Sequence, residues 1–281
     1  MRPPRARQLA RNGLVVESPF GDFTQSVVAV SSCADLDPPD IVVVACKAYG
    51  LSAALDAISP AIGSNTVILP LLNGIAHVDL IRQRLPNAKL WGGLAHIAVT
   101  LTPDGIVKHL NNLHALMFGP LDGARCTAAE EFLACFADTP IDARLRDNII
   151  QDLWDKFVFF ASLAGSTCLM RASIGVILET TKGRSLILGL LDECTRVAEA
   201  ERFAPSVDQI ARYRDELTET GSPFTASMLR DIERGAPTEA EHILGDMVSR
   251  AAAHGISAPL LNIAFAHLQA YESRRVAHLG T

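Results

Sequence analysis

The sequence predicts an α/β domain followed by an all-helical domain. In the first half, short β-rich runs alternate with helical segments, which is typical of a doubly wound, mostly parallel sheet. One of these runs, DIVVVACK over residues 40–47, is continuously apolar, the pattern of a parallel strand covered on both faces. After about residue 147 almost every segment has helical period. We therefore expect one domain over 1–146 and a second over 147–281.

The first domain is expected to open with a hairpin-like pair of strands, Leu14 to Val16 and Phe23 to Val30, around the turn at 19–22. Beyond the strand at 40–47, helix and strand patterns alternate. They predict a helix over 51–62, a strand over 66–72, a helix over 75–85, and strands over 91–101, 105–109 and 115–118.

The second domain is predicted to be helical over 148–163, 186–202, 207–217, 238–253 and 259–272. The helix at 238 should start with a capping box, in which Thr238 is the N-cap and Glu241 is the third helical residue. The uncharged, strongly apolar run at 157–170 is too short to span a bilayer.

Composition narrows the function. The 281 residues carry a net charge of -6 without a basic stripe, which disfavours a nucleic-acid partner. The six cysteines form no CxxC pair and no metal-ligand spacing with histidine, so we assign no metal. No signal-peptide pattern occurs, and a cytoplasmic protein with no membrane partner is expected. G-x-G-x-x-G, the P-loop, G-x-S-x-G and H-E-x-x-H motifs do not occur in this sequence.

Polar residues follow two of the buried strands directly. Lys47 ends the run at 40–47, and Asn73-Gly74 follows the strand at 66–72. Each has a plain structural interpretation, a solvated lysine and a left-handed turn. Because doubly wound sheets bind ligands at the carboxyl ends of their strands, the two together also indicate one crevice that holds an amine and an amide.

Three further candidates lie in the helical half. Lys156 interrupts the apolar segment DLWDKFVFFASL, either as a lysine whose stem covers the core or as a desolvated proton donor with a lowered pKa. Glu239 is either a favourable charge in the first helical turn or a site carboxylate. Ser227 is most simply the first residue of a helix.

An ordered set of segments extends over nearly the whole chain: NGLVVESPFGD, DIVVVACKAYG, LLNGIAH, LAHIAVTLTPDGIVKH, MFGP, DLWDKFVFFASL, SMLRDIERGAPTEAEHILG and AAAHGISAPLLN. Within it, 26 residues separate Lys47 from Asn73, and 12 residues separate Ser227 from Glu239. This set, with these spacings, resembles the ketopantoate reductases (2-dehydropantoate 2-reductases), NADPH-dependent members of the 6-phosphogluconate-dehydrogenase-like superfamily.

The resemblance implies a role for each candidate. Lys156 would be the catalytic acid that protonates the ketone oxygen as hydride arrives from NADPH. Glu239 would hold the substrate hydroxyl or orient that lysine. Asn73 and Ser227 would contact the substrate, and Lys47 and Asn73 would lie at the cofactor. The activity implied is reduction of a 2-keto acid to the 2-hydroxy acid, as in pantothenate biosynthesis, by a homodimer joined through its helical half.

The chain departs from the family pattern in two places. Asparagines usually stand four and eight residues after the catalytic lysine, where this chain has Phe160 and Ala164. The loss of two amides favours a less polar 2-keto acid than ketopantoate. The chain also starts at about the arginine that contacts the 2'-phosphate, represented by Arg2 or Arg5. We therefore expect a Rossmann-type domain without its first strand, Gly-rich loop and first helix.

Two other functions are consistent with the sequence. The chain could be a degenerate paralogue or binding protein that has lost the cofactor phosphate site, since the Gly-rich anchor for the pyrophosphate does not occur. Alternatively, it could carry out the same reduction on a different hydroxy acid.

Overall fold

The computed structural model describes residues 3–279, and its contacts divide the chain into two compact units. Unit 1 comprises residues 1–46, 50–72 and 78–149, and unit 2 comprises 47–49, 73–77 and 150–281. The two short segments of unit 2 follow strands of unit 1. Arg2 lies outside the described residues.

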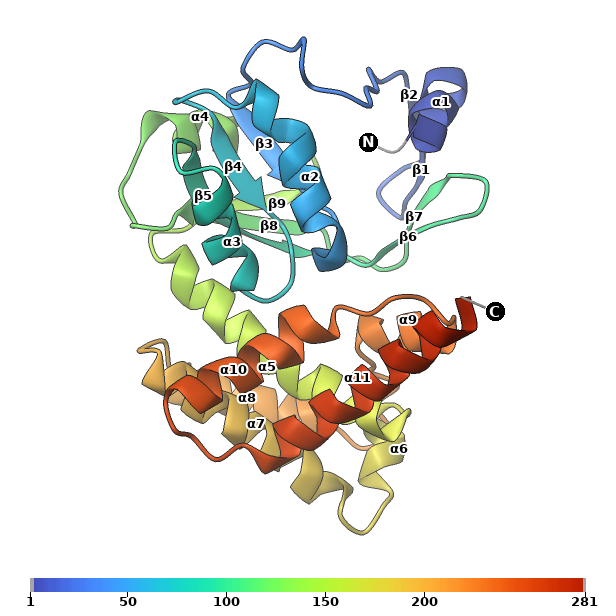
Figure 1. The fold of residues 1–281 in the computed structure, drawn as a ribbon, viewed down its shortest axis with the longest axis vertical. Coiled ribbons are helices and arrows are strands. Elements are labelled where there is room, and N and C mark those ends of the chain that lie inside the picture. The colour runs from blue at the N-terminus through green and yellow to red at the C-terminus, as the bar shows by residue number, and fades with distance from the viewer. Residues whose placement is uncertain (1–2, 280–281) are drawn as a thin grey trace. The chain divides into compact units, whose positions relative to one another are not determined.

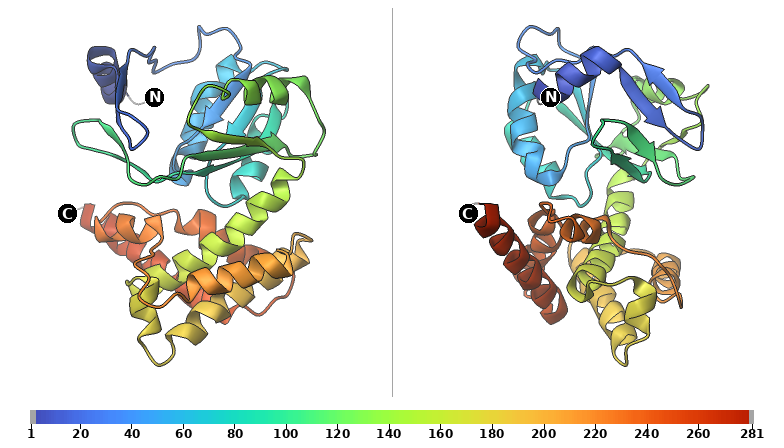
Figure 2. Two further views of the ribbon diagram at one scale, coloured as in Figure 1. Left: turned by 180° about the vertical axis from the view of Figure 1, so that it is seen from behind. Right: turned by 90° about the vertical axis from the view of Figure 1, so that its right-hand side faces the viewer.

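Unit 1 is a mixed α/β unit with two sheets (Figures 1 and 2). The five-stranded sheet has the order β3-β4-β5-β8-β9, and the four-stranded sheet has the order β2-β1-β7-β6. The strands are β1 (Leu14–Glu17), β2 (Phe23–Gln25), β3 (Ile41–Val44), β4 (Val67–Pro70), β5 (Lys89–His96), β6 (Val99–Leu101), β7 (Val107–His109), β8 (Ala115–Pro120) and β9 (Asp142–Leu145). The helices are α1 (Pro3–Asn12), α2 (Leu51–Ile58), α3 (Ala76–Arg84) and α4 (Thr127–Ala134).

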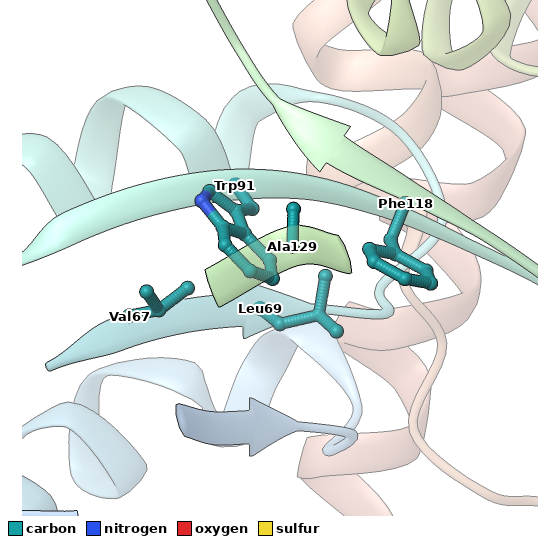
Figure 3. Close-up of a cluster of buried hydrophobic side chains, with 5 residues drawn as sticks. All are labelled: Val67, Leu69, Trp91, Phe118 and Ala129. Carbon is teal, nitrogen blue, oxygen red and sulfur yellow. The ribbon is translucent and has the colours of Figure 1, made fainter. Parts of the chain in front are cut away.

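The larger sheet is mostly parallel, as the alternating pattern predicts. β3, β4 and β5 pair in parallel, as do β8 and β9, while β5 and β8 are antiparallel. The hairpin of β1 and β2 is also confirmed, with Val15 opposite Thr24. Helices α2 and α3 cover one face of this sheet and α4 the other (Figure 2). Under α4 lies a cluster of buried side chains from β4, β5, β8 and the helix: Val67, Leu69, Trp91, Phe118 and Ala129 (Figure 3).

Three details of unit 1 differ from the sequence-based expectation. The single strand expected over 91–101 is two strands, β5 and β6, which belong to different sheets. The strand expected up to Val30 ends at Gln25. The apolar run of β3 was expected to be covered on both faces, but Val43 is 47% exposed, so this edge strand is open to solvent on the face that carries Val43.

Unit 2 is helical. Its helices are α5 (Ile149–Met170), α6 (Ile174–Leu178), α7 (Gly183–Ala200), α8 (Val207–Leu217), α9 (Ser227–Glu233), α10 (Asp246–Ala253) and α11 (Pro259–Leu279), with a π-helical turn η3 (Glu241–Gly245) before α10. Helices α7, α10 and α11 pack on one another (Figure 1). No helix within residues 3–279 is long and apolar enough to cross a membrane.

The predicted capping box at Thr238 is wrong. The helix starts at Ala240 and passes at once into η3. Thr238 donates both its backbone N–H and its hydroxyl to Glu272 Oε1, at 2.6 and 2.7 Å, and Gln269 donates to Glu241. A carboxylate from α11 therefore takes the hydrogen bonds that a local cap would have made, which sequence spacing cannot reveal.

Candidate active site

Two adjacent parallel strands bring Lys47 and Asn73 to corresponding positions. Val44 at the end of β3 is the register partner of Pro70 at the end of β4. Lys47 and Asn73 each come three residues after those partners. The register of β3 against β4 therefore places the Lys47 amine and the Asn73 amide at equivalent positions beyond two neighbouring strands.

The Lys47 ammonium is held by two carboxylates. Its Nζ lies 3.0 Å from Asp231 Oδ2 and 3.2 Å from Glu239 Oε2. The other Glu239 oxygen, Oε1, accepts the backbone N–H of Ala48 at 2.9 Å. The side chains of Lys47, Asp231 and Glu239 are 41%, 23% and 6% exposed, so Glu239 is the buried member of the group. We call these three residues the Lys47 cluster.

Electrostatics within the cluster favour the charged lysine. Burial lowers the pKa of Lys47, but the charges of Glu239 and Asp231 and their hydrogen bonds outweigh it, so the pKa lies above its ordinary value. Lys47 is therefore a firmly protonated hydrogen-bond donor. The plain interpretation of a solvated strand-end lysine does not describe it, because both carboxylates hold it in place.

Asn73-Gly74 forms the left-handed turn that the sequence predicts. Gly74 has a φ of 75°. A Cβ at this position would lie 3.0 Å from Ile243 Cδ1 and 3.2 Å from the His242 carbonyl oxygen. The turn thus packs directly against η3. His77, in the first turn of α3, approaches the same segment, with Nδ1 3.4 Å from His242 Nε2.

Lys156 lies on α5 among buried side chains. Its neighbours Leu153, Trp154 and Phe157 are almost fully buried, while Lys156 itself is half-buried. Removal from water lowers the pKa of Lys156 from 10.5 to about 8. A lysine with a pKa near neutrality can both hold a proton and release it at physiological pH, which is what a general acid requires.

Ser227 and Glu239 come from consecutive short segments of unit 2. Ser227 is the first residue of α9, as expected, and is half-buried. Asp231 follows one helical turn later, so the two side chains share one face of α9. Glu239 immediately precedes the helix that starts at Ala240. Its contacts are with Lys47 and Ala48, so it orients a lysine at the end of β3.

A cavity of about 460 Å³ opens beside Glu239 within unit 2. Its lining combines Ala48, Tyr49 and Ala76 with residues 237–242, which lead into η3, and the α11 side chains Glu272 and Arg275. Among residues 3–279 no group of three or more His, Cys, Asp or Glu side chains could hold a metal ion.

Helix α1, which carries the basic residues of the N-terminal segment, is hydrogen-bonded to another part of unit 1. Arg5 Nη1 donates to the carbonyl oxygen of Gly105 at 2.8 Å and to Gln8 at 2.7 Å. These contacts anchor α1 to the turn between β6 and β7.

Comparison with known proteins identifies the family. The model of the ketopantoate reductase PanE/ApbA family matches residues 1–123, and the model of its C-terminal domain matches residues 148–272. The chain belongs to the ketopantoate reductase family. It is 30% identical over 277 residues to the uncharacterised oxidoreductase YkpB of Bacillus subtilis, covering 98% of this chain and 90% of that protein.

Solved structures share the fold of this chain. The 2-dehydropantoate 2-reductase of Methylococcus capsulatus is 26% identical, with a TM-score of 0.85 over 96% of this chain and 87% of that one. A D-mandelate dehydrogenase, solved with NADH and anilino(oxo)acetate, is 20% identical with a TM-score of 0.83 over 96% of this chain and 88% of that one. At that identity the second likeness shows the fold alone.

Phe160 and Ala164, which stand where the family usually has asparagines, lie on the same helix as Lys156. Phe160 follows it by one turn and is half-buried, and Ala164 follows by a further turn and is fully buried. At these spacings all three residues share one side of α5. This side offers an ammonium, an aromatic ring and a methyl group.

Sequence reasoning missed Asp231. In the segment SMLRDIE, Asp231 is most simply interpreted as a solvent-exposed charge on a helix. Its partner, Lys47, lies 184 residues away in the sequence. The one available signal was its position four residues after Ser227, on the same helix face.

Proposed function

We propose that this member of the ketopantoate reductase family catalyses the NADPH-dependent reduction of a 2-keto acid to the 2-hydroxy acid. The observation that carries the proposal is the Lys156 ammonium, whose pKa of about 8 suits a proton donor at neutral pH. Membership of an oxidoreductase family supports the same chemistry.

Lys156 is proposed as the catalytic acid. Hydride addition to a ketone builds negative charge on its oxygen, and an ammonium nearby stabilises that charge and then donates its proton. Because Lys156 is partly removed from water, its charge acts more strongly on the substrate than an exposed lysine would. Asn73 and Ser227 are proposed to hydrogen-bond the substrate and its carboxylate.

The residues beyond β3 and β4 fit a nicotinamide nucleotide. Doubly wound sheets bind nucleotides at the carboxyl ends of their strands, where Lys47 and Asn73 lie. The nucleotide supplies the hydride. We propose that Lys47, Asn73 and Arg2 contact it and that Glu239, through Lys47 and the Ala48 amide, fixes the local backbone.

The substrate is proposed to be less polar than ketopantoate. Phe160 can contact an apolar group one helical turn from the proton donor but cannot hydrogen-bond a hydroxyl. A buried substrate hydroxyl without a partner costs about 1 to 3 kcal/mol. The D-mandelate dehydrogenase of this fold holds anilino(oxo)acetate, an aromatic ligand, which supports the suggestion.

The helical residues 147–281 are proposed to form the substrate domain and to join two copies into a homodimer, while 1–146 bind the nucleotide. Light scattering coupled to size-exclusion chromatography tests the dimer. A mass near 60 kDa supports it, because one chain is 30.2 kDa.

A substrate and cofactor panel tests the proposed function. NADPH and NADH are each offered with ketopantoate, phenylpyruvate, phenylglyoxylate and 2-ketoisovalerate, and kcat/KM is measured for every pair. We expect NADPH to be preferred and kcat/KM to be highest for a keto acid without a side-chain hydroxyl. The substitution Phe160→Asn should shift the preference toward ketopantoate by about tenfold. If no keto acid is reduced and neither nucleotide binds, the proposal fails.

A further inference from the structure

Asp231 is the closer of the two carboxylates to the Lys47 ammonium. The Nζ to Oδ2 distance is 3.0 Å, against 3.2 Å to Glu239. Asp231 comes from α9, Glu239 precedes η3, and Lys47 follows β3, so three separate elements meet at one ammonium. Within the described residues, the contact between Asp231 and Lys47 is therefore the only ion pair that links α9 to this lysine.

The charges of the cluster do not balance. One ammonium faces two carboxylates, so the group carries a formal charge of -1, and the more deeply buried carboxylate is that of Glu239. Glu239 also accepts the Ala48 amide, so its position is fixed from two sides. Lys47, by contrast, has a long stem and a side chain that is 41% exposed. Without Asp231, the ion pair that remains on the Lys47 ammonium within residues 3–279 would be the longer contact with Glu239.

We propose that Asp231 is a positioning residue of the active site, which fixes the Lys47 ammonium for its contact with the bound ligand. Asp231 acts through Lys47 and does not itself touch the ligand. Because Asp231 lies one turn after Ser227, the same ion pair also couples the orientation of α9 to Lys47. The ligand part of this inference rests on the proposed function, whereas the restraint on Lys47 does not.

Amine labelling tests the restraint without any activity. Acetylation of Lys47 at pH 8 is followed by mass spectrometry in the wild type, Asp231→Asn, Asp231→Ser and Asp231→Glu, with exposed Lys182 as internal reference. Loss of the carboxylate frees the ammonium and lowers its pKa, so labelling of Lys47 should rise about threefold or more in the Asn and Ser variants. The Glu variant should label close to the wild-type rate.

Glu233→Gln is the matched control, since it removes one negative charge from the exposed side of the same helix. Equal Lys47 labelling in wild type, Asp231→Asn and Asp231→Ser would overturn the proposal. So would a failure of both neutral variants to fold, because Asp231 would then serve the stability of unit 2. A rise of the same size in Glu233→Gln would show a general charge effect and would also overturn it.

The ligand arm uses a double-mutant cycle of Asp231→Asn and Lys47→Met. A freely moving lysine must be ordered on binding, so Asp231→Asn should raise KM about 3- to 10-fold with kcat changed less than twofold. In the Lys47→Met background the same substitution should change KM less than twofold. Equal effects in both backgrounds would overturn the positioning role. If the wild type shows no reductase activity, the proposed function fails, and the labelling arm still decides the restraint.

Discussion

Replacing Lys156 by methionine should change how stability depends on pH. Burial lowers the pKa of Lys156 from 10.5 to about 8, so the folded protein holds this ammonium at a cost. At 1.36 kcal/mol per pH unit, the cost at neutral pH is about 3 kcal/mol. Methionine has a similar length and no charge, and it removes the cost.

The sign follows from proton binding. Between pH 8 and 10.5 the unfolded chain keeps the Lys156 proton while the folded chain releases it, so the stability of the wild type rises with pH in this window. The penalty is fully present below pH 8. The stability of the wild type relative to Lys156→Met should therefore increase by about 2 kcal/mol between pH 7 and pH 9.5.

Urea unfolding at pH 7, 8, 9 and 9.5 measures this difference, followed by circular dichroism at 222 nm, to which the helices of unit 2 contribute strongly. Other groups titrate equally in both proteins and cancel. Lys182→Met, which removes an exposed lysine, is the control and should give a difference that does not change with pH. A stability difference between wild type and Lys156→Met that stays constant over the same range would refute the reasoning.

Three further predictions concern activity and packing. The rate of keto acid reduction should be constant at low pH and fall tenfold per pH unit above about pH 8, as Lys156 loses its proton; a rate that rises with pH would contradict the acid role. Glu193 on α7 is 4% exposed and accepts hydrogen bonds from the first backbone amides of α11. Glu193→Ala should therefore lower the free energy of unfolding, measured in urea, by about 3 kcal/mol. The control Glu199→Ala, at an exposed position of α7, should lower it by less than about 0.5 kcal/mol. Gly74→Ala should lower stability by about 1 to 2 kcal/mol because of its φ of 75°, and a neutral result would contradict the left-handed turn.

Local pattern predicted most of the fold because most elements of this chain follow local rules. β4 is buried along its whole length and α8 has the bounds that its period predicts. The sequence-based predictions fail where contacts with a distant segment determine whether an element forms or where it starts. β9 has only four residues, with alternate positions exposed, and it forms by pairing with β8. The start of the helix near Thr238 is set by Glu272, which lies 34 residues further along the chain.

The sequence predicted which residues belong to the candidate site better than it predicted which of them contact one another. Lys47, Asn73, Lys156, Ser227 and Glu239 stand out by residue type and by the ends of elements on which they lie. The partner of Glu239 was predicted as the substrate or Lys156, whereas the structure gives it Lys47 and the Ala48 amide. Ion pairs between residues nearly 200 positions apart leave no periodic signal in one sequence.

The turnover number of Lys156→Met tests the central claim most directly. With saturating NADPH and the best keto acid of the panel, we expect kcat at pH 7 to fall 10²- to 10⁴-fold relative to the wild type, while the Kd for NADPH changes little. Lys182→Met should retain the wild-type kcat. A Lys156→Met protein that reduces the keto acid at the undiminished wild-type rate would contradict the account.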